Sequence, residues 1–130
     1  MATPTPGGTG QTNLGMAPNV AGLLCYVPCC IGLIFSVVAA IVEKKSRFVR
    51  FHAFQSLLLH GALIALWFAI MVLQVGLGVV GLGPLALLVQ LLAFVVGVAL
   101  LAMTVFMMIK ANGGEEFELP TIGPMARQWV

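Results

Sequence analysis

The side chains best suited to chemistry are two histidines, His52 and His60, and three cysteines in the preceding apolar stretch. The cysteines are Cys25, Cys29 and Cys30. An odd number of cysteines in such a setting is no disulfide framework, and a tetrahedral zinc site needs further cysteine or histidine ligands nearby. We therefore interpret the cysteines as small apolar packing residues beside Pro28.

His60 is expected about two turns inside the apolar part of its helix, where polar groups usually face protein or a water-filled path. We favour an interhelical hydrogen bond, with Ser36 and Thr104 as candidate partners. The alternatives are a residue on a proton or substrate path and a ligand to a tetrapyrrole pigment. His52 lies nearer the end of the apolar run, and we expect it to contact lipid headgroups or the first loop.

The two histidines belong to a polar stripe that continues along one side of the helix at about 3.6 residues per turn. Its members are His52, Ser56, His60, Trp67 and Gln74. Because buried polar groups in lipid need partners, we expect this stripe to face protein, a partner subunit or a bound ligand.

Catalytic constellations are missing from the sequence. There is no Ser-His-Asp set, no phosphate-binding glycine loop and no HExxH motif. No acidic residue lies within an apolar stretch, which argues against a proton-coupled pump. The net charge of +2 gives no reason to expect a nucleic-acid partner. We expect a protein that is not an enzyme and has no cofactor, with a pigment or a lipid as the alternative ligand.

The composition places these residues in a membrane. Hydrophobic residues make up 61% of the chain and charged residues 8%, against roughly 25% charged in soluble domains. A soluble protein of this composition would expose large apolar patches. We therefore expect an all-α integral membrane protein.

Three transmembrane helices are predicted, at about residues 20–42, 47–75 and 84–110, since about 20 apolar residues span the hydrocarbon layer. Pro28 should kink the first, and the glycine-rich run 76–83 should separate the others. Residues 1–18 are expected to form a flexible tail, and residues 111–130 a tail that lies against the protein or the membrane surface.

The only dense charge cluster predicts the orientation. It comprises Lys44, Lys45, Arg47 and Arg50. By the positive-inside rule this loop is cytoplasmic, so three spans put the N-terminus outside and the C-terminus inside. The cluster can also attract anionic lipid headgroups, and membrane lipids are among the expected partners.

Ridges of small residues, which let helices approach closely in lipid, occur in each predicted span. They are Gly32, Ser36 and Ala40 in the first, Gly61, Ala65 and Ala69 in the second, and Ala93 and Gly97 in the third. We expect them to close a three-helix bundle. The alternative is that one ridge docks a partner subunit or a second copy of the chain.

Three segments resemble a family of small prokaryotic membrane proteins of unknown function. They begin at Asn19 (NVAGLLCY), Arg47 (RFVRFHAFQS) and Phe117 (FELPTIG). That family is grouped with the twenty-kilodalton subunit of the chloroplast inner-envelope protein-import translocon. The resemblance implies a multi-pass protein of the prokaryotic cytoplasmic membrane, and it supplies no catalytic residues.

The leading hypothesis is a non-enzymatic, translocon-like or assembly component that works through helix packing with other membrane subunits. One alternative is an accessory subunit of a larger, energy-converting and even photosynthetic complex, with His60 or His52 as ligand. The other is a small oligomeric transporter or channel.

Overall fold

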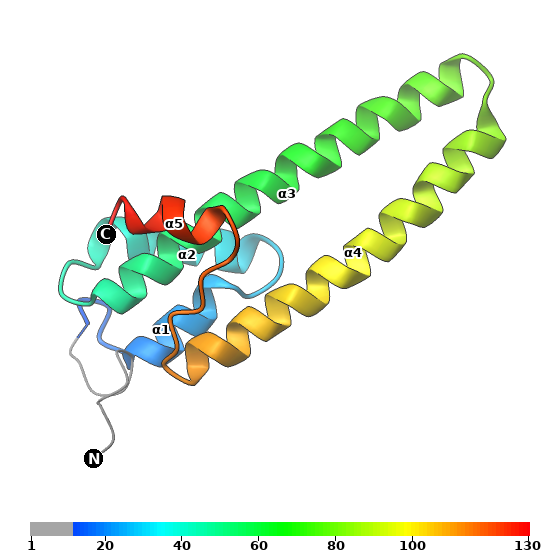
Figure 1. Ribbon diagram of the computed structural model, residues 1–130. Coiled ribbons are helices and arrows are strands. Elements are labelled where there is room, and N and C mark those ends of the chain that lie inside the picture. The colour runs from blue at the N-terminus through cyan, green and yellow to red at the C-terminus, as the bar shows by residue number, and fades with distance from the viewer. Residues whose placement is uncertain (1–11) are drawn as a thin grey trace.

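The computed structural model describes residues 12–130, which form five α-helices (Figure 1). They are α1 (Pro18–Cys25), α2 (Cys30–Val42), α3 (Arg47–Val79), α4 (Gly83–Asn112) and α5 (Ile122–Arg127). The architecture is all-helical, as predicted.

The two long helices, α3 and α4, make an extended hairpin whose far half projects alone (Figure 1). They have 33 and 30 residues, and both are long and apolar enough to cross a membrane. The hairpin turns at Val80–Leu82, where Gly81 adopts a φ of 77°, a conformation that suits glycine. The glycine-rich break was thus predicted correctly, and each helix extends a few residues beyond its expected end.

The predicted first span is not one kinked helix. It is divided into α1 and α2, of 8 and 13 residues, which form a second, short hairpin. Pro28 disfavours helix at the residue before it, and Cys29 has a φ of 70°, which reverses the chain. At 1.5 Å per residue, neither helix is long enough to cross about 30 Å of hydrocarbon.

The C-terminal segment returns across the hairpins and ends in α5, which lies on α3 (Figure 1). The expectation that residues 111–130 lie against the protein is correct. Leu119, Gly123 and Ala126 of this segment are buried. The core of the molecule lies here, where α1, α2 and the first turns of α3 meet the last turns of α4.

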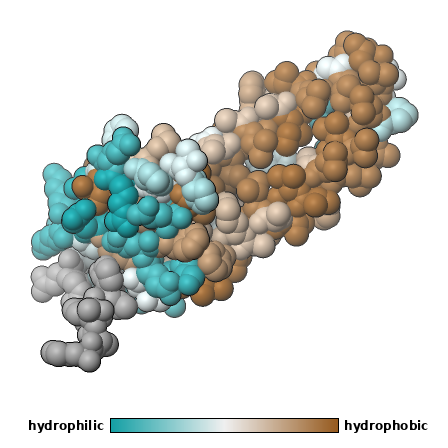
Figure 2. Space-filling model, viewed as in Figure 1, coloured by the Kyte–Doolittle hydropathy of each residue, from teal (hydrophilic) through white to brown (hydrophobic). Residues whose placement is uncertain are grey.

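Polar residues gather at this end, and the projecting half of the α3–α4 hairpin is covered by apolar residues (Figure 2). We call the first region the junction and the second the apolar arm, which comprises the hairpin from about residue 61 to residue 103. The exposed side chains of the arm include Phe68, Val75, Leu87 and Phe94, each more than half exposed.

The start of the described chain also lies at the junction. The Asn13 backbone N–H donates to the Glu43 carboxylate at 2.7 Å, and the Asn13 side chain accepts from the backbone N–H of Lys44 at 2.9 Å. Residues 12–17, assigned to a flexible tail, are therefore held on the first loop; residues 1–11 of that tail lie outside the described part of the chain. A three-span path would place Asn13 and Glu43 on opposite sides of a membrane, and the structure has them in contact.

Candidate functional site

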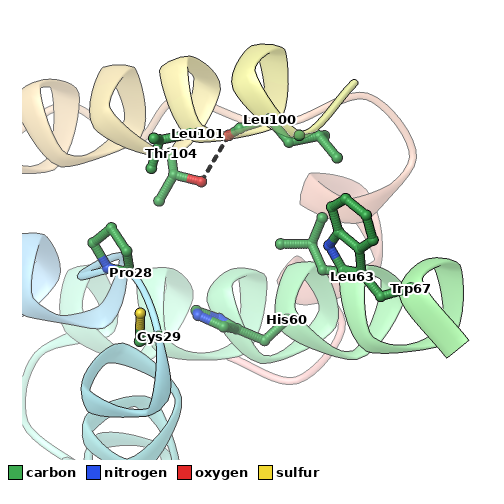
Figure 3. Close-up of a pocket in the computed structure, with 9 residues that line it drawn as sticks. Pro28, Cys29, His60, Leu63, Trp67, Leu100, Leu101 and Thr104 are labelled. Atoms are coloured by element: carbon green, nitrogen blue, oxygen red, sulfur yellow. Dashed lines mark hydrogen bonds between the residues drawn. The ribbon is translucent and has the colours of Figure 1, made fainter. Parts of the chain in front are cut away.

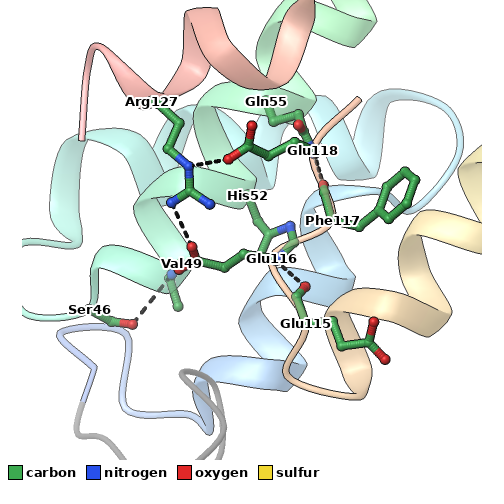
Figure 4. A network of polar contacts seen from close by, with 9 residues as sticks. All are labelled: Ser46, Val49, His52, Gln55, Glu115, Glu116, Phe117, Glu118 and Arg127. Carbon is green, nitrogen blue, oxygen red and sulfur yellow. Dashed lines mark hydrogen bonds and ion pairs between the residues drawn. The ribbon is translucent and has the colours of Figure 1, made fainter. Parts of the chain in front are cut away.

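A chain of hydrogen bonds through His52 connects the α1–α2 turn, α3 and the C-terminal segment. Figure 4 shows the part between α3 and the C-terminal segment. His52 is fully buried. Its Nδ1 lies 3.1 Å from the Tyr26 hydroxyl, and its Nε2 lies 3.1 Å from the Glu115 carbonyl oxygen. The carbonyl can only accept, so Nε2 carries the proton and Nδ1 accepts from the tyrosine. Both ring nitrogens are occupied, and His52 has none left for a ligand.

Gln55, one turn further along α3, completes this chain with all of its amide groups in use. Its Nε2 donates to the Tyr26 hydroxyl and to the Phe117 carbonyl, both at 2.9 Å, and its Oε1 accepts from the Leu119 backbone N–H at 3.0 Å. A single buried side chain thus binds the α1–α2 turn and the C-terminal segment to α3. Such fully satisfied networks specify one packing arrangement.

Aromatic rings enclose the same histidine. The rings of Phe48, Phe51 and Tyr26 meet His52 edge-on with centroids 4.4, 5.3 and 5.6 Å away. The run RFVRFHAFQS therefore acts as one unit, in which Phe48, Phe51, His52, Gln55 and Ser56 are all buried. The three segments of the family resemblance meet around it.

Two serines close the end of α1. The Cys25 carbonyl, left without an intrahelical donor at the end of the helix, accepts from the Ser36 hydroxyl at 3.1 Å and from the Ser56 hydroxyl. The two hydroxyls also lie 3.0 Å apart. The chain break at Pro28 is thus stabilised by polar side chains of α2 and α3.

His60 differs from His52, because it is half-buried and bonds only within its own helix. Its Nδ1 lies 2.8 Å from the Ser56 carbonyl oxygen and therefore donates to it. Ser36 and Thr104 were the expected partners, and neither bonds to it: Ser36 bonds to Gly32 and Ser56, and Thr104 donates to the Leu100 carbonyl. The Ser56 carbonyl lies one turn before His60 in the same helix, so it satisfies Nδ1 without a partner from another helix.

The free edge of the His60 ring faces a cavity of about 150 Å³ between α3, α4 and the tip of the α1–α2 hairpin (Figure 3). Trp67 and Thr104 line it across from Cys29. No hydrogen bond to His60 Nε2 forms within residues 12–130. The cavity is mostly apolar, so it suits an apolar group with one hydrogen-bond donor.

The buried residues of the polar stripe face protein, as predicted, whereas Trp67 is 41% exposed. His52 and Ser56 are buried, Trp67 packs within 3.4 Å of the position a Cβ would take on Gly97, and Gln74 donates to the Ala86 carbonyl at 3.1 Å. Each residue of the stripe therefore meets the α1–α2 hairpin or α4.

The small-residue ridges have two different surroundings. Gly32 and Ser36 are buried against α3 and the α1–α2 turn, with Ala40 at their edge, and Ala93 and Gly97 face α3. Gly61, Ala65 and Ala69 are exposed, and nothing lies within 4 Å of a Cβ built on Gly61. This third ridge packs on no other part of the described chain.

Ion pairs tie the C-terminal segment to the surface of the junction. Arg127 pairs with Glu116 at 2.6 Å and with Glu118, and its guanidinium lies 4.3 Å from the centre of the Phe51 ring. The Glu118 carboxylate, followed by Glu116, raises the pKa of Arg127 above its ordinary value. Lys110 pairs with Glu115 at 2.9 Å.

Glu43, at the end of α2, has a fully buried carboxylate. It accepts from the backbone N–H groups of Asn13, Lys45 and Ser46 at 2.7 to 2.9 Å. Ser46 in turn caps α3 by accepting from the Val49 N–H at 3.3 Å. Lys44, Lys45 and Arg47 are exposed around this loop, and Arg50 is half-exposed.

Sequence reasoning missed the roles of Tyr26, Gln55 and Glu43. Tyr26 and Gln55 were quoted for the resemblance, and no hydrogen bond was expected of them. The available signal for Tyr26 and Gln55 was their polarity, because each interrupts an apolar stretch and so requires a buried partner. Among residues 12–130, no group of three or more histidine, cysteine or acidic side chains could hold a metal ion.

The fold defines a helical membrane protein with two long apolar helices and a polar junction at one end. Residues 10–126 match the magnetosome magnetite crystal formation protein family, and the chain belongs to this family. The match covers all three segments that carried the resemblance, and it gives no support to the relation with the chloroplast import translocon.

Three curated relatives are archaeal membrane proteins named UPF0132. One from Methanocaldococcus jannaschii is 38% identical over 120 residues, which cover 92% of this chain and 94% of the relative. One from Archaeoglobus fulgidus is 32% identical, covering 88% of this chain and 97% of the relative. A second from M. jannaschii is 28% identical over 89% of this chain and 72% of that protein. No solved structure matches the chain.

Proposed function

We propose that this protein is a non-enzymatic membrane scaffold that assembles with other membrane helices, or with copies of itself, through the apolar arm. The observation that carries the proposal is the exposed Gly61-Ala65-Ala69 ridge. Small residues at this spacing let a second helix approach closely in lipid. The family's name refers to magnetite crystal formation, and a scaffold of membrane proteins is compatible with that setting.

The proposal includes a revised topology. Two spans, α3 and α4, cross the cytoplasmic membrane, and the α1–α2 hairpin enters from the same side as the first loop without crossing. An apolar helix of 10–14 residues is typical of such re-entrant or interfacial segments. Lys44, Lys45 and Arg47 then place this side in the cytoplasm. The N-terminal segment bonded to Glu43 and the C-terminus lie on that side too.

A reporter active only outside the cytoplasm tests this topology. It should be active when inserted at Gly81 and inactive when fused before Asn19 or after Val130. Activity before Asn19 would restore the three-span arrangement and contradict the revised one.

The assembly test is the Ala65→Leu variant in lipid vesicles. Its larger side chain should separate the helices and lower the association constant about tenfold, which corresponds to about 1.4 kcal/mol and lies within the usual overpacking cost of about 1–3 kcal/mol. Ala99→Leu adds the same three carbon atoms at an exposed position of α4, outside the ridge, and is the matched control. Counting photobleaching steps of labelled protein measures the oligomeric state.

Equal association of the two variants would show that the ridge faces lipid. A wild-type chain that stays monomeric in vesicles, and that purifies from its native membrane without another membrane subunit, would contradict the scaffold itself. Secretory proteins that co-purify with it would favour the translocon-like form of assembly.

A second candidate function is supported by the cavity beside His60, whose Nε2 has no partner within the described residues. Here the protein would be an accessory subunit that holds a pigment or other apolar ligand. His52 no longer qualifies, since both of its nitrogens are bonded. Loss of a pigment absorption band in His60→Leu, with His60→Gln as a control of similar polarity, would favour this function; natively purified protein without absorbing pigment would contradict it.

A further inference from the structure

We infer that the junction holds one anionic phospholipid, with its phosphate at Arg47 and Arg50 and the upper part of an acyl chain in the groove beside Trp129. This inference goes beyond the scaffold, because it assigns a ligand to the basic loop and a role to the C-terminal residues. Two independent features support it: the charges of the loop and the shape below them.

The chain has four acidic residues, and the structure engages each of them. Glu115 pairs with Lys110, and Glu116 and Glu118 pair with Arg127. The carboxylate of Glu43 is buried and bound by backbone N–H groups.

No acidic side chain is therefore left to pair with the four cations of the first loop and the start of α3. Residues 1–11 contain no Asp or Glu either. The loop cations lie at the end of a helix that is long and apolar enough to cross a membrane. The surface of a bilayer that contains anionic lipids supplies the missing negative charge.

The contacts of its side chain distinguish Arg50 from Lys44 and Lys45. Its Nη2 donates to the Trp129 carbonyl at 3.0 Å, and its guanidinium lies 5.8 Å from the centre of the Phe54 ring. The Nε atom is buried and has no hydrogen-bond partner among the described residues. The protein thus fixes the orientation of the guanidinium and satisfies only part of its five donors. A planar guanidinium held in this way suits a phosphate.

An apolar groove adjoins Arg50, because Phe54 and Trp129, which Arg50 contacts, both line it. It has a volume of about 210 Å³ and is lined by Phe54, Leu57, Leu58 and Trp129. On α3, Arg47, Arg50, Phe54 and Leu57 follow one another at helical spacing, so they share one face. The Trp129 ring is 63% exposed and lies 6.2 Å from the Phe54 ring. A tryptophan in this position is typical of the membrane–water interface.

A lipid fits these features better than a soluble phosphate compound, because the groove beside the cations is lined by apolar side chains. Its occupant would place a phosphate among cations and an acyl chain among Phe54, Leu57 and Leu58. We commit to phosphatidylglycerol as the probe, since it carries one negative charge and a small headgroup.

The test measures the fluorescence of Trp129 in the full-length Trp67→Phe variant. In this variant Trp129 is the only tryptophan of the chain. The protein is placed in phosphatidylcholine vesicles that contain a small fraction of lipid brominated on its acyl chains. Brominated phosphatidylglycerol should quench Trp129 more strongly than the same fraction of brominated phosphatidylcholine. Removing either arginine should lower the relative association constant about fivefold.

The matched control distinguishes a specific lipid-binding site from general attraction of anionic lipid to a basic cluster. Lys44→Gln removes the same charge from the same basic cluster, at a residue that does not line the groove. The inference requires Arg50→Gln to reduce the selective quenching clearly more than Lys44→Gln does. Equal effects of the two variants, or equal quenching by the two brominated lipids, would overturn it. So would full competition by excess inorganic phosphate, which would indicate a site for the free anion.

A second measurement guards against a misfolded reporter variant. Native mass spectrometry of the wild-type chain, released from vesicles of equal phosphatidylglycerol and phosphatidylcholine, should retain one phosphatidylglycerol, and Arg50→Gln should not. Retention by both proteins would overturn the inference. The scaffold hypothesis is tested separately by Ala65→Leu, so either idea can fail alone.

Discussion

The junction and the apolar arm are parts of the same two helices and are held together in different ways. At the junction, buried polar side chains connect α1, α2, α3 and the C-terminal segment. In the arm, α3 and α4 share few polar contacts, among them those of Gln74 with Ala86 and Gln90, and most side chains are exposed. The junction is thus specified from within, whereas the arm needs lipid or a partner to cover it.

This difference explains where the specific residues of the sequence lie. The RFVRFHAFQS run, Tyr26 and residues 115–119 all serve the junction. The arm requires apolar character and small residues at a few positions, and many sequences meet that requirement. A family resemblance carried by the junction therefore indicates the fold and says little about what the arm binds.

The largest expected difference between the junction and the apolar arm comes from replacing one glutamine in each region. Gln55→Leu leaves the Phe117 carbonyl, the Leu119 N–H and the Tyr26 hydroxyl without their partner, and should lower the free energy of unfolding by about 4 kcal/mol. Gln74→Leu, in the arm, should cost less than about 1 kcal/mol. Thermal unfolding in detergent measures both, and proteolysis should release the C-terminal segment only in Gln55→Leu. Equal costs would remove the distinction between the regions.

Glycine substitutions give the next largest contrast. A Cβ on Gly32 would lie 2.1 Å from the Val27 carbonyl oxygen, whereas a Cβ on Gly61 meets nothing within 4 Å. Gly32→Ala should therefore destabilise the junction by about 2–3 kcal/mol. Gly61→Ala should stabilise α3 by up to about 1 kcal/mol through its helix propensity. A destabilised Gly61→Ala monomer would show that this ridge packs inside the chain.

Helix positions, the glycine turn and the collection of charges at one end followed from the sequence, because they depend on local composition. The division at Pro28 did not follow, because proline is tolerated within membrane helices when its neighbours satisfy the freed groups. Here Ser36 and Ser56 bind the Cys25 carbonyl and stabilise a full reversal. That outcome depends on contacts between residues 11 and 31 positions apart.

The candidate site, like the fold, could be predicted from the sequence only in part. Polarity and helical spacing correctly predicted that His52 and Ser56 of the stripe face protein. They did not identify the partners, since Glu115, Phe117 and Leu119 contribute only backbone groups, which any residue carries. The predicted hydrogen-bond partners of His60 were wrong for the same reason, because its actual acceptor, the Ser56 carbonyl, is a backbone group.

The hydrogen bonds of the two histidines provide a further test, with a smaller expected change in the free energy of unfolding. Tyr26→Phe removes one hydroxyl that bonds to both His52 and Gln55, and should cost about 2 kcal/mol. The network also requires opposite tautomers, with the proton on Nε2 of His52 and on Nδ1 of His60. The ¹⁵N chemical shifts of the two rings should report this difference at neutral pH. The same tautomer in both rings would contradict the hydrogen-bond directions.

The smallest expected effect comes from the surface of the junction. Arg127 pairs with Glu116 and Glu118, and these three side chains are between 20% and 41% exposed. Water and salt screen such pairs, so Arg127→Gln should cost only about 0.5–1 kcal/mol at low ionic strength. Its loss of the contact with the Phe51 ring is included in that figure.

Salt provides the control for this last variant. The difference in unfolding temperature between wild type and Arg127→Gln should shrink as ionic strength rises, since the Debye length falls to about 3 Å at 1 M salt. The cost of Gln55→Leu should not change with salt, because its bonds are buried and neutral. If Arg127→Gln instead destabilised the chain as much as Gln55→Leu, exposed ion pairs would hold the C-terminal segment in place. The junction would then depend on ionic strength, and its buried network would be only a secondary contribution.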